Sequence, residues 1–316
     1  MILLSIIAAI LPMLIYLYFL WKFDRNEPEP IKFVVLHFIY GATAAIILGF
    51  AGSKILSLPL DLFFSEERIF FLKTIMIAPI VEELAKSSLL FKTMSNKNID
   101  NLTDGLIYGG AIGLGFGMTE NFLYFLAFGD TLTTLVPIII IRTLFSAVMH
   151  TISTATVGGM MSLAKYSSKN KYAISTIVGL LVAMFIHFTW NLSVSFSTTF
   201  IVGLLFLLLI IIIFILTFYF SLKFENKIIR KELVNEIPPN LLSQLTSPRR
   251  FQKGWFLNPF QNKFIEVSIK LAFRKHEVDI SDGNNEIYNE EIESLREQIS
   301  ILINKQNSSN PAETGQ

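Results

Sequence analysis

Seven apolar stretches divide the sequence, and each is close to the ~20 residues that a helix needs to cross a bilayer. They cover residues 1–21, 33–56, 69–91, 105–128, 135–163, 172–194 and 200–222. Hydrophobic residues make up 52% of the chain and charged residues only 16%, a combination that soluble domains rarely show. The sequence therefore predicts an all-α, polytopic bundle of about seven transmembrane helices, multi-pass in the cell membrane and in contact with its lipids.

Signals between the stretches predict the topology. The first stretch has no basic segment before it and no small-residue cleavage site after it, so we expect it to be retained as a span. Lysine and arginine concentrate in alternate loops, which predicts an amino terminus outside and a cytoplasmic carboxyl terminus. We expect residues 1–222 to form the transmembrane core. Residues 223–316 are expected to form a cytoplasmic tail, with an amphipathic helix near 290–303 and a disordered end of about a dozen residues.

Composition limits the possible chemistry. The chain has no cysteine, which excludes disulfides, thiolate nucleophiles and cysteine metal sites. The formal net charge of +1 says nothing about partners, and we expect no nucleic acid among them. The tail contains no recognisable catalytic pattern.

Three ionisable residues cluster in the third stretch: Glu82, Glu83 and Lys86. Each charge costs roughly 3 kcal/mol at the bilayer centre, so these side chains should face protein or an internal water pocket. At about 100° per residue, Lys86 lies between the two carboxylates in projection and can pair with either. The other carboxylate would then be free to act as a base. Pro79, one turn earlier, removes a backbone donor and predicts a kink beside them.

Polar residues recur at membrane depth in the next three stretches. They are Glu120 and Asn121 in the fourth, Arg142, Ser146, His150 and Thr154 in the fifth, and His187 and Asn191 in the sixth. The residues of the fifth stretch are spaced four apart, as are those of the sixth, so each of these two sets lies on one helix face. We expect these groups to converge, with those of the third stretch, on one pocket.

Such a pocket suits hydrolysis of a peptide bond without a covalent intermediate. A glutamate can take a proton from water, a histidine can orient that water, and a second histidine with an asparagine amide can hold the oxyanion. Alternatively, His150 and His187 with a carboxylate could bind zinc, which acidifies its bound water. The cofactor is therefore none or zinc. The residues favour the glutamate-activated water without excluding the metal.

Two other classes of function would use the same residue types. An ion-coupled transporter also buries Glu, His and Arg, but such carriers usually contain internal repeats, and the two halves of this chain show none. A non-enzymatic scaffold would use the polar residues only to lock helices together. Reconstitution with a single-span substrate, or measurement of proton flux, would separate these classes.

The motifs together resemble the PrsW family of bacterial intramembrane proteases. The resemblance covers about residues 1–222 and rests on the sequence Glu82 to Lys86, Thr119-Glu120-Asn121 with Tyr124-Phe125, His150, and the run His187 to Asn191. That family is similar to the wider group of CAAX-processing and bacteriocin-processing membrane proteases. The chain departs from the wider group at Lys86, where an arginine is usual, and at Phe145, which lies five residues before His150 instead of four.

The resemblance implies a role for each residue. Glu82 would be the base that activates water, with His150 beside it, and His187 with Asn191 would form the oxyanion site. Glu83 and Glu120 would be supporting groups, and we expect Lys86, Asn121 and Arg142 to support the site as well. The implied reaction is cleavage of a membrane-anchored protein. The substrate implied is an anti-sigma factor cut on its extracytoplasmic side, a site-1 cleavage in an envelope stress response.

Overall fold

The computed structural model describes the whole chain except residues 25, 97–98, 100, 281–285 and 310–316, and the described residues contain no β-strand. The chain divides into two compact units, and the division falls inside helix α10. The first unit comprises Met1–Asp24, Pro28–Lys165 and Lys169–Tyr219, and the second comprises Arg25–Glu27, Tyr166–Ser168 and Phe220–Gln316. That the first is a protease core and the second a cytoplasmic tail stays a prediction.

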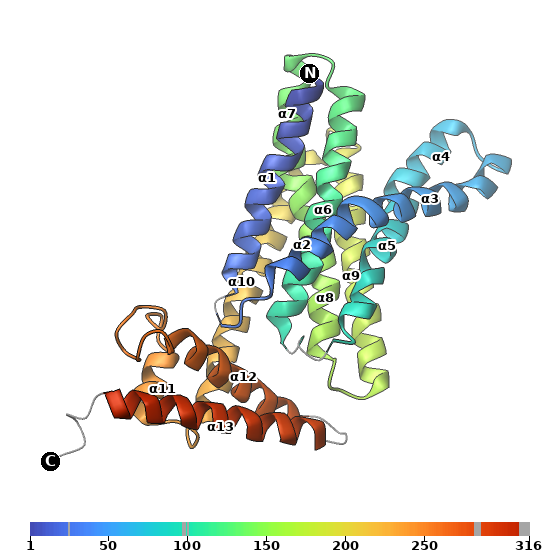
Figure 1. Cartoon of the computed structure of the whole chain (residues 1–316). Helices are drawn as coiled ribbons and strands as arrows, with labels where there is room; N and C mark the ends of the chain where they lie inside the picture. The colour runs from blue at the N-terminus through green and yellow to red at the C-terminus, as the bar shows by residue number, and fades with distance from the viewer. Residues whose placement is uncertain (25, 97–98, 100, 281–285, 310–316) are drawn as a thin grey trace. The chain divides into compact units, whose positions relative to one another are not determined.

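The first unit is a helical bundle (Figure 1). Its helices are α1 (Ile2–Phe23), α2 (Ile31–Tyr40), α3 (Ile46–Ser57), α4 (Glu66–Leu72), α5 (Ala78–Thr93), α6 (Leu102–Phe128), α7 (Leu132–Ile141), α8 (Ala147–Leu163), α9 (Lys169–Val194) and the first part of α10 (Phe200–Leu233). A short 3₁₀ helix, Leu58–Leu62, follows α3. Three π-helical turns join α2 to α3, α4 to α5 and α7 to α8; they are Gly41–Ala45, Lys73–Ile77 and Arg142–Ser146.

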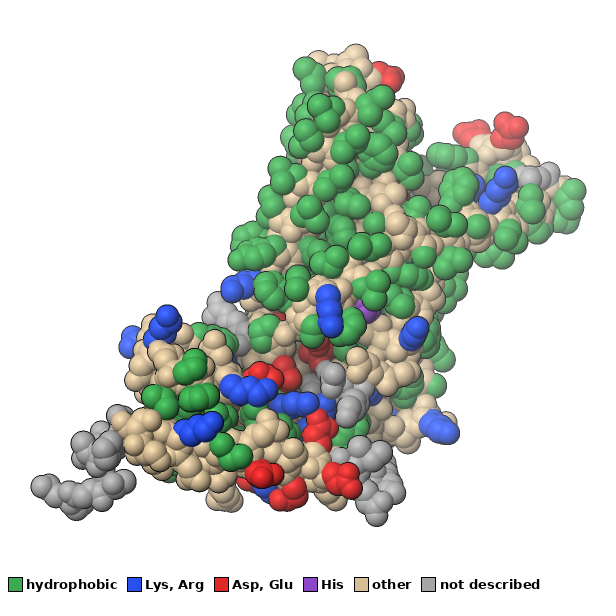
Figure 2. Space-filling view, viewed as in Figure 1, with side chains coloured by type: hydrophobic (Ala, Val, Ile, Leu, Met, Phe, Trp, Pro, Cys, Tyr) green, Lys and Arg blue, Asp and Glu red, His purple; other side chains and the backbone are tan. Residues whose placement is uncertain are grey.

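Six of the described helical segments are long and apolar enough to cross a membrane: Ile2–Phe23, Ile31–Leu60, Leu102–Phe128, Leu132–Leu163, Lys169–Val194 and Phe200–Leu233. Hydrophobic side chains cover the visible face of the bundle, as contact with lipid requires (Figure 2). The fold class is therefore confirmed as a polytopic helical membrane bundle. The charged α4–α5 segment, which contains the predicted third span, is not one of the six. The count of seven spans and the orientation of the termini stay predictions.

Helix α6 lies at the centre of the bundle, and every residue from Thr103 to Gly117 is buried. It packs most extensively against α8. The spacing of its glycines brings the two backbones together: a Cβ added to Gly113 would lie 2.2 Å from the carbonyl oxygen of His150. A glycine repeat allows membrane helices to pack closely. The close contact at Gly113 therefore also fixes the position of His150 along the axis of α8.

The second unit has its own apolar core. It contains the end of α10, α11 (Pro239–Leu245), α12 (Gln261–Ile280) and α13 (Glu286–Ser309). Aromatic residues of the predicted tail pack inside it, with the rings of Phe256 and Phe264 stacked 4.4 Å apart. Helix α13 contains the predicted amphipathic segment 290–303 and extends it at both ends. Of the predicted disordered end of about a dozen residues, 310–316 lie outside the described residues, and the residues before them are helical, because α13 continues to Ser309.

Candidate functional site

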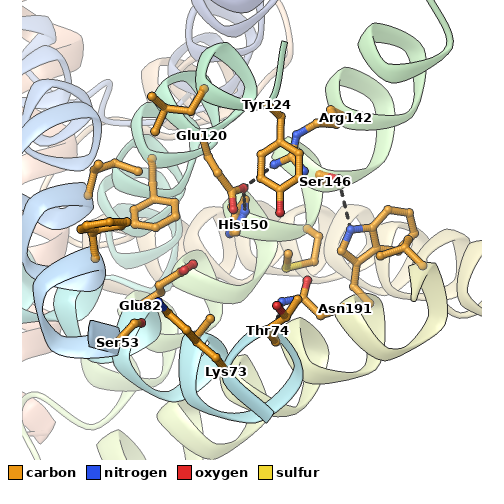
Figure 3. A pocket seen from close by; sticks show the side chains of 18 of the residues that line it. Ser53, Lys73, Thr74, Glu82, Glu120, Tyr124, Arg142, Ser146, His150 and Asn191 are labelled. Atoms are coloured by element: carbon orange, nitrogen blue, oxygen red, sulfur yellow. Dashed lines mark hydrogen bonds and ion pairs between the residues drawn. The ribbon is translucent and has the colours of Figure 1, made fainter. Parts of the chain in front are cut away.

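A pocket of about 760 Å³ opens in the first unit, between α3, α5, α6, α8, α9 and the π-turns before α5 and α8 (Figure 3). Its polar lining consists of Ser53, Lys73, Thr74, Glu82, Glu120, Tyr124, Arg142, Ser146, His150 and Asn191. Phenylalanine, leucine and isoleucine side chains supply much of the rest. π-turns inside α-helices are rare and concentrate at functional sites. Here two of the three supply residues to the lining.

Glu83 and Lys86 form an ion pair that is completely buried. The Glu83 carboxylate also accepts hydrogen bonds from Ser153 and Thr154 and lies 2.9 Å from Nδ1 of His187. A buried carboxylate is tolerated when its lone pairs are used in this way. The sequence allowed Lys86 to pair with either glutamate. In the structure it pairs with Glu83, so Glu82 has no ion pair with this lysine.

Glu82 is the contrasting carboxylate. Its side chain is 15% exposed to the pocket, and its buried Oε2 has no hydrogen-bond partner among the described residues. Nε2 of His187 lies 3.8 Å from this oxygen, which is too long for a hydrogen bond. Helix α3 approaches closely here because it has a glycine: a Cβ on Gly49 would lie 3.1 Å from Cγ of Glu82.

The contact with Glu83 sets the orientation of the His187 ring. Glu83 is a carboxylate that can only accept, so the proton of the 2.9 Å bond belongs to Nδ1 of His187. Nε2 then carries a lone pair and faces Glu82. The histidine is buried, with 1% of its surface exposed, so this orientation is held on all sides.

His150 is held at both ring nitrogens. Nζ of Lys86 donates to Nδ1 at 3.0 Å, and Nε2 lies 2.7 Å from Oε2 of Glu120. Because the ammonium group can only donate, Nδ1 is the acceptor and Nε2 donates to Glu120. The His150 ring lies edge-on to that of His187, with centroids 4.8 Å apart. The two histidines expected to share a site do so.

Arg142 supports the opposite wall. It forms an ion pair with Glu120 at 2.5 Å, and its Nε donates to Oδ1 of Asn121 at 3.0 Å. Its guanidinium lies 3.6 Å from the centre of the Tyr124 ring. The two cations Lys86 and Arg142 are thus each matched with a carboxylate. Glu82 is the remaining acidic group of the cluster.

Asn191 reaches the backbone of the π-turn before α5. The N–H of Ala78 bonds back to the carbonyl of Lys73, and Pro79 has no N–H, so the Thr74 carbonyl loses its helical donor. Nδ2 of Asn191 donates to that carbonyl at 3.0 Å. The disturbance predicted at Pro79 is therefore a π-turn. Asn191, a predicted site residue, donates to the Thr74 carbonyl that this turn leaves without a backbone donor.

Three groups of the site could hold a metal ion together. Glu82, His150 and His187 each offer one ligand atom, and these atoms lie within 4.8 Å of one another. Two imidazoles and a carboxylate form a donor set that zinc uses in catalytic sites. The unpartnered Oε2 of Glu82 fits this set, and so does His187, whose other nitrogen bonds a carboxylate. His150 would have to give up one of its two hydrogen bonds.

The structure brings all the predicted site residues into one cluster. Glu82, Glu120, Arg142, His150 and Asn191 line the pocket directly. The others, Glu83, Lys86, Asn121 and His187, contact these residues from behind. Their individual roles stay proposals.

Three polar lining residues were not expected from the sequence: Ser53, Lys73 and Thr74. A lysine inside an apolar stretch is a recognisable signal, and Lys73 lies within the predicted third span. Ser53 and Thr74 carry no such signal. Their position follows from the π-turn and from the packing of α3 on α5.

Comparison with known proteins identifies the family of this chain. The family model described as "PrsW family intramembrane metalloprotease" matches residues 29–218. The chain is 25% identical over 183 residues to Protease PrsW of Clostridioides difficile strain 630, covering 57% of this chain and 75% of that protein. It is 25% identical over 170 residues to Protease PrsW of Geobacillus kaustophilus, covering 52% and 68%. With Protease PrsW of Oceanobacillus iheyensis it shares 27% over 179 residues, covering 56% and 78%.

No solved structure matches the chain. The family match spans well over half of the sequence and contains every residue of the pocket. The relatives are proteases, and of the helices that build the pocket, α3, α6, α8 and α9 lie in segments that are long and apolar enough to cross a membrane. The chain therefore belongs to the PrsW family, and it is an intramembrane protease.

Proposed function

We propose that Glu82 is the base that activates the hydrolytic water, with His187 as its partner. The unpartnered Oε2 of Glu82, 3.8 Å from the lone pair on Nε2 of His187, carries this proposal. Both atoms are acceptors, so one water can donate a proton to each and keep a lone pair for the peptide carbonyl. Glu82 takes the proton as the water attacks and returns it to the leaving amine nitrogen.

Asn191 is positioned to polarise the substrate carbonyl. A side-chain amide has two N–H groups, and the bond to Thr74 uses one of them. The second can donate to the oxygen that becomes negatively charged in the transition state. His187 was expected to share this task, but its Nε2 has no proton to donate in the orientation set by Glu83. We assign His187 to the water and the oxyanion to Asn191.

The same groups fit a zinc ion, which the family description implies. Glu82, His150 and His187 would hold it. Zinc bound there would act as a Lewis acid and make its water more acidic. In either case Glu83 orients His187. Without a metal Lys86 and Glu120 together orient His150, whereas with zinc bound only one of them could keep its hydrogen bond to the ring. Glu82 without a metal is the simpler arrangement, because both nitrogens of His150 already have partners.

The substrate that we propose is a single-span or membrane-anchored protein, cleaved within or next to its span. The pocket supports this because much of its lining is apolar and its catalytic groups lie among helices that can cross a membrane. An anti-sigma factor cut on its extracytoplasmic side is the specific candidate. It rests on the family resemblance alone.

Reconstitution tests the proposal. The full chain, purified into liposomes with a labelled single-span substrate, should cleave it, and Glu82→Gln should lower kcat by about 100-fold or more. Glu67→Gln is the matched control, because Glu67 is an exposed glutamate on α4, in the same helical segment. Equal loss in both variants, or full activity of Glu82→Gln, would refute the assignment.

A second measurement addresses the metal. Zinc content of the purified chain and the effect of a chelator on cleavage should be measured together. Cleavage that persists in a metal-free preparation supports water activation by Glu82 alone. Cleavage that stops, and returns with added zinc, assigns Glu82, His150 and His187 to the ion.

A further inference from the structure

Lys73 is a cation of the pocket that has no polar partner among the described residues. It lies in the π-turn before α5, is half-buried and lines the cavity. No described residue forms a hydrogen bond or ion pair with its Nζ, which lies 5.9 Å from the centre of the Phe50 ring. The other two cations of the site, Lys86 and Arg142, are each paired with a glutamate.

Ser53 supplies a second unused donor. Its side chain lines the same pocket and is only 5% exposed, yet its buried hydroxyl has no hydrogen-bond partner in the part of the chain that the structure describes. It lies three residues after Phe50 on α3, so the two share a helix face. Since Lys73 lies beside Phe50, the Ser53 hydroxyl and the Lys73 ammonium group lie on the same wall of the pocket. Figure 3 shows Ser53 and Lys73 on the side of the pocket where Glu82 lies.

An ammonium group and a buried hydroxyl, neither of them paired with a carboxylate of the described residues, form a site that suits an anion. We propose that Lys73 and Ser53 bind a carboxylate of the substrate, from an aspartate or glutamate side chain near the scissile bond. This inference rests on the proposed function, because it assigns the specificity of the same pocket. It makes Lys73 a specificity residue that selects acidic peptides.

The helix geometry places this carboxylate a few residues from the cleaved bond. Gly49 faces Glu82, and Ser53 lies one turn further along α3, about 6 Å away along the axis. Lys73 precedes Glu82 by nine positions, about 13 Å of helix. An extended peptide advances about 3.3 Å per residue. The acidic residue should therefore lie about two to four residues from the scissile bond.

A paired set of substrates tests the inference. Single-span substrates would carry Glu or Gln at each of the four positions on either side of the scissile bond, and the full chain would be assayed in phosphatidylcholine liposomes. At one position the Glu substrate should be cleaved with kcat/KM about tenfold higher than the Gln substrate, as expected for a charge-assisted hydrogen bond. Lys73→Gln should bring this ratio close to one, and Ser53→Ala should lower it.

Two further variants test whether the ratio of kcat/KM between the Glu and Gln substrates depends on the positive charge at position 73. Lys73→Arg keeps the charge and should keep the preference. Lys54→Gln removes an exposed lysine next to Ser53 that does not line the pocket, and it should also keep the preference. A native chain that cleaves both substrates equally at all eight positions would overturn the inference, as would a Lys73→Gln variant that retains the preference.

A binding measurement separates this inference from the proposed chemistry. Fluorescence anisotropy of labelled Glu and Gln peptides on the Glu82→Gln chain should show tighter binding of the acidic peptide, and Lys73→Gln added to that chain should remove the difference. Preferential binding without cleavage of any substrate by the native chain would support the inference and refute the proposed function. Cleavage by the native chain with no preference for the acidic substrate would support the proposed function and refute the inference.

Discussion

The Glu83 carboxylate lies 2.9 Å from Nδ1 of His187 and thereby turns the lone pair on Nε2 toward Glu82. The two adjacent glutamates consequently have different roles, although they are chemically identical. Glu83 is buried and accepts from four side chains, whereas Oε2 of Glu82 has no hydrogen-bond partner among the described residues. Their difference comes entirely from the helix faces on which they lie.

Glu83→Gln should lower both activity and stability. Loss of a group that orients a metal-ligating histidine typically costs about 10–100-fold in activity, and we expect a loss of the same order for His187. The substitution also leaves Lys86 buried without its ion pair, which costs about 3–5 kcal/mol in comparable cases. Cleavage assays and unfolding in detergent measure the two effects. Lys86→Met added to Glu83→Gln should recover part of the stability but not the activity. A double variant no more stable than the single one would contradict this account.

Asn191 and Pro79 should be energetically coupled. Asn191→Ala removes the donor to the Thr74 carbonyl and should cost about 1 kcal/mol of unfolding free energy. In a Pro79→Ala background the backbone N–H that the alanine introduces can bond that carbonyl, so the same substitution should cost less. A double-mutant cycle on unfolding free energies should give a coupling of at least about 0.5 kcal/mol. If the effects of the two substitutions simply add, the Asn191 amide does not stabilise the fold through its hydrogen bond to the Thr74 carbonyl.

Hydrophobic patterning was enough to predict the long apolar helices, their approximate ends and the membrane class. It did not predict α11 and α12 of the second unit, or the end of α10. The apolar run ends near Leu222, but the helix continues to Leu233 because the following residues contain neither glycine nor proline. The three π-turns have no signature in a single sequence, since the register of a helix depends on what it packs against. Pro79 predicted a disturbance but not its form.

The candidate site was predictable as a set of residues but not as a network. Charges inside apolar stretches identify Glu82, Glu83 and Lys86, and helical spacing relates His187 to Asn191. Spacing alone cannot decide which glutamate Lys86 pairs with, because both lie one turn away. That choice depends on α8 and α9, which bring donors for Glu83 and, among the described residues, none for Oε2 of Glu82.

Gly113→Ala should disturb His150 through the backbone. The added Cβ would lie 2.2 Å from the His150 carbonyl oxygen, so α6 and α8 must move apart. We expect lower thermal stability together with a loss of cleavage. Gly117→Ala is the graded control, because its Cβ would meet its nearest neighbour, Ala147, at 3.0 Å. A Gly113→Ala chain as stable and active as the native chain would show that this close approach is not required.

Glu236 should make the second unit sensitive to acid. Hydrogen bonds from Arg296 and Lys275 lower the pKa of Glu236 from 4.5 to about 2. A carboxyl whose pKa is lower in the folded state stabilises the fold above its unfolded pKa, and this contribution is lost as the pH falls through the folded value. The difference in guanidinium midpoint between the native chain and Glu236→Gln should thus be constant near pH 7, shrink below about pH 4.5 and vanish near pH 2. Other carboxyl groups titrate in both chains and cancel. A difference that stays constant down to about pH 2 would show that the charge of Glu236 does not stabilise this unit.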